Sequence, residues 1–391
     1  MAAEIPVGAF SRAVCNAGAG QLYQHGPLQH LRPLQHLHRA DVSPTLPEGV
    51  GLGCIQLDDS PLAPPSERAV DWGLRLQLPA EKWNGDLGAG SLFLLDSRNK
   101  QARTCKRGLE VSIIGAITTK SREAIGLDAT QTPPISSGTG SSEKGGYTRV
   151  DFYCEQLLDL ASRLREADFP IEHWVGDGYY AKQKGFEAVD RVGAHLVTRL
   201  RSDANLRSLS PCSGEADEKI DWGAPEQLRR RFEEVGRLAD KSEVRVLTAK
   251  AYSPHFDRIL RIVLLATEDF SDYVVLCSTD TAQPAEQVAE YYRLRYQLEF
   301  VIRDAKQHTG LTHCQARSEE KIDFHLNMSV AGVGLLRLLA QKKGCSLHTY
   351  RREASNRMLI GRLFSKLGLR AEFDESDPRI QDVVQIGRMA V

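Results

Sequence analysis

The sequence lacks long apolar runs and has no excess of charge of either sign. No uninterrupted apolar stretch approaches the ~20 residues needed to cross a bilayer, so a membrane protein is not expected. Basic residues number 50 and acidic residues 51, which gives a formal net charge of −1. A surface that is positive all over is therefore excluded, whereas nucleic-acid binding through one local basic patch is not.

Closely spaced cysteines are also missing. The eight cysteines are scattered, and none belongs to a Cys-x-x-Cys pair. A disulfide scaffold and a structural zinc site are therefore not expected, and scattered thiols favour a reducing compartment such as the cytoplasm. The first residues contain no basic segment leading into an apolar core, so the sequence does not indicate a secretory signal.

Composition divides the chain near residue 102. The N-terminal segment holds nine of the 17 prolines, all of them by Pro79, and no lysine precedes Lys82. We find little helical or strand periodicity in it. Residues 1–102 are therefore interpreted as an irregular segment.

The rest of the sequence alternates between strand and helix patterns, which predicts an α/β fold. The predicted strands are 109–117, its hairpin partner 122–127, 173–175 and 195–200. The predicted helices are 150–166, 182–192 and a strongly apolar core helix at 324–341. A Gly/Ser/Thr/Pro-rich surface loop is expected at 133–146, and antiparallel strands at 243–251, 258–265 and 273–277 indicate a β-rich insertion.

A long helix predicted from Gln283 to about His308, the signature helix, carries four regularly spaced polar residues. Tyr292, Arg295, Glu299 and Lys306, the signature stripe, follow the spacing Tyr-x2-Arg-x3-Glu-x6-Lys. At about 100° per residue, they fall within roughly 60° of one another. One interpretation is a solvated face with an i,i+4 ion pair. The other is a metal-binding carboxylate between cations that hold phosphates, which suits phosphoryl transfer on DNA.

Asp177 is a second candidate carboxylate. It follows the predicted strand 173–175 and lies between Gly176 and Gly178. The carboxyl end of a strand is where α/β sheets present ligand-binding groups, and flanking glycines let the backbone approach an ion. The alternative is a turn aspartate, or a cap for the following helix.

Together, these features resemble a known family. The signature stripe matches the Tyr-Arg-Glu-Lys signature of DDE transposases of the insertion-sequence-four group. The segment GDGYYAKQKGF around Asp177 is similar to the segment of that family that contains its second aspartate. The segment GLEVSIIGAI is similar to the one that follows the first aspartate, and the resemblance covers about residues 103–345.

The resemblance implies an RNase H-like mixed sheet with flanking helices, interrupted by a β-rich insertion. It implies a transposase that cuts DNA at insertion-sequence ends and joins them to target DNA. Asp177 and Glu299 would be catalytic and would ligate two Mg²⁺ or Mn²⁺ ions, while Tyr292, Arg295 and Lys306 would contact DNA. A homodimer in a synaptic complex, no membrane partner and a cytoplasmic location are expected by the same analogy.

The resemblance also divides the chain into five regions. These are the irregular segment 1–102, the first segment of the catalytic domain at 103–200, the insertion at 201–280, the second segment of the catalytic domain with the signature helix at 281–345, and a C-terminal tail region at 346–391.

The family's first aspartate is missing from its expected context, Asp-x-Ser-Phe-x-x-Lys-Ser-Gly. Asp71, Asp86 and Asp96 lie upstream of the resembling region, but none has these neighbours. The codons allowed for residues 75–84 can encode that context when they are translated one base later. We therefore hypothesise that residues up to about 100 are translated out of frame, with loss of the central strand and of one metal ligand.

Several interpretations of function stay open at this point. The chain is a transposase, inactive if the first aspartate is lost. Alternatively, it is a catalytically dead DNA-binding remnant or pseudogene product. A generic RNase H-like nuclease would cut DNA without requiring element ends. The coding DNA upstream of Gly108 would test the out-of-frame hypothesis directly.

Overall fold

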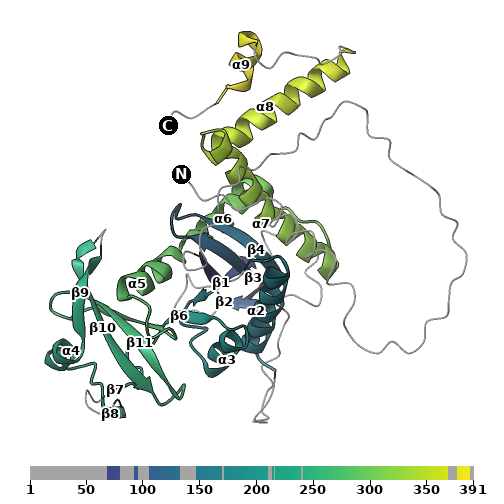
Figure 1. The fold of residues 1–391 in the computed structure, drawn as a ribbon. Coiled ribbons are helices and arrows are strands. Elements are labelled where there is room, and N and C mark those ends of the chain that lie inside the picture. The colour runs from purple at the N-terminus through teal and green to yellow at the C-terminus, as the bar shows by residue number, and fades with distance from the viewer. Residues whose placement is uncertain are drawn as a thin grey trace, which may run out of the picture.

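The fold is built on one mixed sheet with helices on both faces (Figure 1). A computed structural model of the chain describes residues 68–79, 92–95, 105–132, 147–169, 171–209, 214, 216–238, 241–368 and 377–387. The described strands are β1 (Arg68–Pro79), β2 (Leu92–Leu95), β3 (Cys105–Thr118), β4 (Ala124–Gln131), β5 (His173–Gly176), β6 (His195–Arg199), β7 (Arg207–Leu209), β8 (Ala216–Lys219), β9 (Glu233–Leu238), β10 (Lys241–Ser253), β11 (Arg258–Ala266) and β12 (Tyr273–Ser278). The described helices are α2 (Arg149–Glu166), α3 (Gln183–Arg191), α4 (Pro225–Arg231), α5 (Ala285–Leu294), α6 (Gln297–Asp304), the π-helical segment η4 (Ala305–Thr309), α7 (Glu319–Lys342), α8 (Leu347–Lys366) and α9 (Pro378–Val384).

The strands follow the order β2-β3-β1-β5-β6-β12-β11-β10-β7-β8, with β4 paired to β3 and β9 paired to β10. β1, β5 and β6 are parallel, whereas β3, β4 and the strands β10 to β12 are antiparallel to their neighbours. The predicted α/β alternation and the β-rich insertion are confirmed. The order of strands is consistent with an RNase H-like sheet. The predicted loop 133–146 lies outside the described residues.

Two apolar layers hold the helices on the sheet. On one face, Tyr153 and Leu157 of α2 join Trp174 and Leu196 of the parallel strands in a buried cluster. On the other face, residues of α6 and α7 pack against β3 and β4; these residues are Leu298, Val301, Leu326 and Val330 on the helices and Val111, Ile113 and Ala129 on the strands. Each large apolar side chain that is fully buried contributes about 1.5–3 kcal/mol. On the same face as α6 and α7, Val175 of β5 and Val197 of β6 are buried with Val288 and Tyr291 of α5, so both faces of these parallel strands are covered.

The out-of-frame hypothesis predicts that the central strand of the sheet is lost. In the structure, β1 occupies this central position. It pairs antiparallel with β3 and parallel with β5. Apolar residues stand at every second position from Val70 to Leu78, which is the pattern of a strand. The structure therefore differs from the sequence prediction at residues 68–79 and 92–95, which form strands. The rest of residues 1–102 lies outside the described residues, and the out-of-frame hypothesis stays a prediction.

The signature helix is three consecutive segments, α5, α6 and η4, rather than one regular helix. Between α5 and α6, the hydrogen bonds change to the i→i−3 spacing; the N–H of Leu298 donates to the C=O of Arg295 at 3.1 Å. Each residue of a 3₁₀ turn advances about 120° instead of about 100°. In the π-helical segment η4, which begins at Ala305, the rotation per residue is smaller than in an α-helix. The regular spacing assumed for the signature stripe therefore does not hold along its whole length.

The apolar helix predicted at 324–341 is α7, which begins earlier, at Glu319. Among the described residues, α7 alone is long and apolar enough, by length and composition, to cross a membrane. It packs on β4 through Val330 and Val333, as a core helix of a globular protein does. The prediction that its leucines are core is wrong for Leu335, which is 46% exposed.

The strands of the insertion and the strands β1 to β6 form one sheet. β12 pairs with β6, and β11 and β10 extend the sheet from β12 into the insertion. The buried cluster on the α2 face continues without a break to Leu228, Phe256 and Leu260 of the insertion. The insertion therefore has a fixed position beside the carboxyl ends of β5 and β6 (Figure 1).

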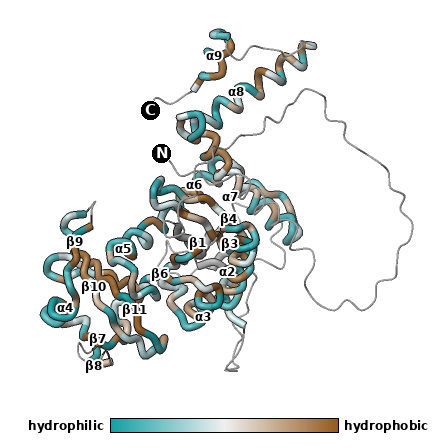
Figure 2. Tube along the Cα trace, viewed as in Figure 1, coloured by the Kyte–Doolittle hydropathy of each residue, from teal (hydrophilic) through white to brown (hydrophobic). Residues whose placement is uncertain are grey.

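The C-terminal tail region contains two helices among its described residues. α8 and α9 lie away from the sheet, beyond the end of α7 (Figure 1). In α8, only Thr349 and Glu353 are buried. Hydrophilic and hydrophobic residues alternate along this helix (Figure 2).

Candidate functional site

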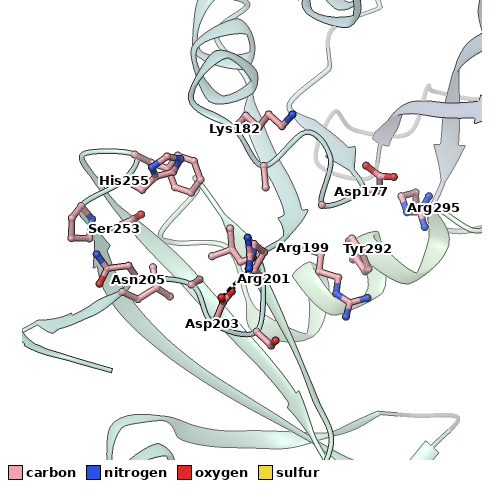
Figure 3. Close-up of a pocket in the computed structure, with 18 residues that line it drawn as sticks. Asp177, Lys182, Arg199, Arg201, Asp203, Asn205, Ser253, His255, Tyr292 and Arg295 are labelled. Atoms are coloured by element: carbon pink, nitrogen blue, oxygen red, sulfur yellow. Dashed lines mark hydrogen bonds and ion pairs between the residues drawn. The ribbon is translucent and has the colours of Figure 1, made fainter. Parts of the chain in front are cut away.

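A cavity of about 1240 Å³ lies between β5, β6, α5 and the insertion (Figure 3). Asp177, Tyr292 and Arg295 line it together. These residues come from positions more than 110 apart in the chain (292 − 177 = 115). The structure thus brings one of the two predicted carboxylates to the first half of the signature stripe.

A tight turn fixes Asp177 at the end of β5. Its Oδ1 accepts a hydrogen bond from the N–H of Tyr179 at 2.8 Å, and its C=O accepts one from the hydroxyl of Thr198 at 3.0 Å. Gly178 lies close to the backbone of Arg199. A Cβ built on Gly178 would lie 3.1 Å from the carbonyl oxygen of Arg199. The half-buried carboxylate points toward Arg295 (Figure 3). Asp177 is therefore a turn residue that also lies beside Arg295, and it does not cap α3, whose N-cap is Lys182.

Tyr292 and Arg295 form one unit beside Asp177. The guanidinium carbon of Arg295 lies 5.6 Å from the centre of the Tyr292 ring. Burial raises the pKa of Tyr292, and the charge of Asp177 acts in the same direction, whereas Arg295 and Arg199 oppose the increase. The phenol is therefore a hydrogen-bond donor at neutral pH. The Nε of Arg295 is buried and has no hydrogen-bond partner among the described residues.

Three further cations line the cavity and were not predicted as site residues. Lys182, Arg199 and Arg201 are exposed, and Arg201 is paired with Asp203 at 2.9 Å. Gly176 pairs with Thr198 in the sheet, so Arg199 stands level with Asp177. The available signal was the position of Arg199 at the carboxyl end of a strand parallel to the one before Asp177. That neighbourhood depends on strand order, which the sequence does not state.

Glu299 and Lys306 lie further along the helical run, and neither is among the residues that line the cavity. Glu299 is half-buried on α6, about 6 Å along the axis from Arg295. Its neighbour Leu298 packs on β3 at Gly115, where an added Cβ would lie 2.6 Å from Leu298 Cδ1. Lys306 is exposed on η4. The structure therefore does not place all four residues of the signature stripe around one cavity.

The backbone of β1 passes between these two regions. Asp71 is in register with Val175 of β5, two residues before Asp177. It is also in register with Gly115 of β3, on which Leu298 packs. Among the three aspartates considered upstream, Asp71 thus has a strand position next to the predicted carboxylates.

The donor types of this site suit a hard divalent cation, because Asp177 and Glu299 offer carboxylate oxygens. However, the described side chains include no group of three or more His, Cys, Asp or Glu residues that could hold a metal ion. Cations outnumber carboxylates in the cavity, and such a lining attracts phosphate groups.

A family model matches the middle of the chain. No curated protein matches the chain. The matched family region begins at Cys154 in α2 and ends at Ala331 in α7, so it includes Asp177, the insertion and the signature stripe. Residues 154–331 match the family model of the transposase DDE domain.

Proposed function

We propose that this chain is a transposase that cleaves and joins DNA at the ends of an insertion sequence. The observation that supports this most is the cavity shared by Asp177, Tyr292 and Arg295, within the region that matches a transposase DDE domain. The finer placement in the insertion-sequence-four group rests on the signature stripe. We also propose a cytoplasmic location and a homodimer on paired DNA ends.

In this proposal, the cations of the cavity hold the DNA backbone. Arg295 and Arg199 would bind phosphate oxygens on either side of Asp177, and the phenol of Tyr292 would donate a hydrogen bond to one of them. Asp177 and Glu299 would ligate Mg²⁺ or Mn²⁺, which lowers the pKa of a bound water or hydroxyl and neutralises developing phosphoryl charge. The protein positions the scissile phosphate and supplies fixed positive charge, which are the main contributions to phosphoryl transfer.

A nicking assay tests the proposal. The substrate is a supercoiled plasmid that carries the DNA flanking the coding sequence, and nicking is measured with Mg²⁺ and with EDTA. We expect Mg²⁺-dependent nicks at the element ends, and a loss of at least about 100-fold in Asp177→Asn and in Glu299→Gln. Glu286→Gln, an exposed carboxylate in the first turn of α5, is the matched control and should nick normally.

The missing third carboxylate can be tested separately at Asp71. As an alternative to the out-of-frame hypothesis, we propose Asp71 as the third carboxylate of an active chain, because its backbone is in register with Val175, two residues before Asp177. Asp71→Asn should then abolish nicking as Asp177→Asn does. An unchanged rate in Asp71→Asn would leave this aspect of the proposal without support.

A catalytically dead DNA-binding remnant is the second candidate function. It is favoured by the sequence, in which the family's first aspartate is missing from its expected context, Asp-x-Ser-Phe-x-x-Lys-Ser-Gly. A remnant would bind DNA with a strong salt dependence but would not nick it, with or without Mg²⁺. A generic nuclease would instead nick plasmids that lack the element ends at the same rate.

A further inference from the structure

α8 presents a stripe of positive charge on its exposed side. The helix contains five basic residues, Arg351, Arg352, Arg357, Arg362 and Lys366, and one acidic residue, Glu353. At about 100° per residue, Arg351, Arg362 and Lys366 fall within roughly 60° of one another. We name these three residues the α8 stripe. It spans about 22 Å along the helix axis.

The α8 stripe lies on the opposite side of the helix from the ion pairs of Glu353. Glu353 is buried and bonds to Lys343 and Arg357 on the other side of the helix. All three residues of the stripe are exposed. None of them makes a hydrogen bond or ion pair with a residue that the structure describes. Their charge is therefore not neutralised within the described segments of the chain.

The stripe begins where the signature helix ends. The rings of His308 in η4 and His348 in α8 lie 6.0 Å apart. Burial lowers the pKa of His308, and the nearby charge of Arg351 lowers it further. Lys306 is exposed two residues before His308. The charge of Arg351 therefore lies beside the end of η4, and the stripe runs from there along α8.

We propose that the α8 stripe is a second DNA-binding surface, which holds the backbone of duplex DNA beyond the cavity of Asp177. A row of cations without ion-pair partners among the described residues, on a helix of this length, fits the regularly spaced phosphates of a duplex. An anionic membrane surface would also attract the stripe, but the stripe begins beside η4, within the region that matches a transposase DDE domain. The inference does not depend on the proposed strand cleavage, because it requires no metal ion.

The test is binding of a fluorescent 30-bp duplex, measured by anisotropy with the full chain in EDTA at several salt concentrations. In the triple variant R351Q/R362Q/K366Q, we expect the affinity at low salt to fall roughly tenfold or more. The slope of log K against log[salt] should decrease by up to about 2.7, since each lost phosphate contact accounts for about 0.9.

A matched variant controls for the change in total charge. Lys219, Arg230 and Lys250 are exposed in the insertion and do not line the cavity. K219Q/R230Q/K250Q should leave both affinity and slope close to those of the wild type. Equal losses in the two triple variants would overturn the proposal, because total charge would then explain the binding.

Two further measurements separate the remaining outcomes. Circular dichroism at 222 nm and the thermal midpoint should be unchanged in R351Q/R362Q/K366Q, because the substituted side chains are exposed. Co-sedimentation with phosphatidylserine vesicles tests the membrane alternative. Loss of vesicle binding without loss of DNA binding in this variant would also refute the proposal. If the stripe is needed for DNA binding but the protein does not nick DNA, the proposed catalysis would be wrong and the proposed DNA-binding surface would stand.

Discussion

At the scale of single residues, Gly126 lets α7 lie directly on β4. A Cβ built at this position would overlap Cγ1 of Val330, a stiff β-branched side chain. We expect Gly126→Ala to lower the free energy of unfolding by about 1–3 kcal/mol through overpacking. Urea denaturation provides the measurement.

A second substitution identifies the cause. In the double variant Gly126→Ala/Val330→Ala, the methyl groups that clash are gone, so the two changes should be less costly together than the sum of the single changes. Strict additivity would show that overlap with Val330 is not the cause.

Asp323 on α7 should make stability depend on pH. Burial raises its pKa to about 7, and the charges of Glu319 and Asp128 add to the increase. Its Oδ1 accepts a hydrogen bond from the N–H of Gln131 at 3.0 Å. In the unfolded chain the carboxyl has a pKa of about 3.9. Between these values the folded state binds more protons than the unfolded state, so stability falls as pH rises from about 4 to about 7.

Asp323→Asn removes this dependence, because an amide oxygen can still accept the hydrogen bond from Gln131 but carries no charge. Its stability relative to the wild type should be greater at pH 8 than at pH 5, by roughly 1–3 kcal/mol. Chemical denaturation at the two pH values measures this. Asp382→Asn, at an exposed position on α9, is the control. A difference that is the same at both pH values would contradict the raised pKa.

At the scale of elements, the end of η4 depends on one left-handed residue. Gly310 has a φ of +75°, and the hydroxyl of Thr309 donates to the C=O of Ala305 and to that of Ser329. These contacts close the wide π turn on α7. Gly310→Ala should destabilise the fold by about 1 kcal/mol, because a side chain is strained at this φ.

Gly361 offers the matched control within α8. It has no positive φ, and an added Cβ would meet no atom within 4 Å. Gly361→Ala should therefore stabilise the protein by about 0.5–1 kcal/mol. If both alanines had the same effect, the conformation of Gly310 would not be the reason for its cost.

Periodicity predicted most elements of the catalytic domain, because each pattern is local. The strand at 109–117 and the helix at 150–166 are present as β3 and α2, with ends shifted by a few residues. β1 was missed although its alternation from Val70 to Leu78 is regular. The breaks in the signature helix were missed as well, since the hydrogen bonds near Arg295 and η4 respond to packing on the sheet and on α7.

At the scale of the whole molecule, the continuous sheet predicts that the insertion and the strands β1 to β6 unfold together. β12 joins β6, and one buried cluster contains both Trp174 and residues of the insertion that contact Trp222. With Trp72 and Trp83 replaced by Phe, variants that retain either Trp174 or Trp222 report on the two regions. In urea denaturation followed by tryptophan fluorescence, we expect each variant to show a single unfolding transition. The m-values of the two transitions should be equal, and their midpoints should differ only by the difference in stability between the variants. A separate, earlier transition at Trp222 would show that the insertion unfolds independently.

The sequence by itself determined the residue types of the site and the elements on which they stand. The spacing of the signature stripe and the strand before Asp177 are local patterns, so they are visible without coordinates. Only the tertiary structure decided which side chains share a cavity. Asp177, Arg199 and Arg295 meet because β5 and β6 are parallel neighbours and α5 packs across their ends. Strand order depends on contacts between residues far apart in the chain, and a single sequence does not record them.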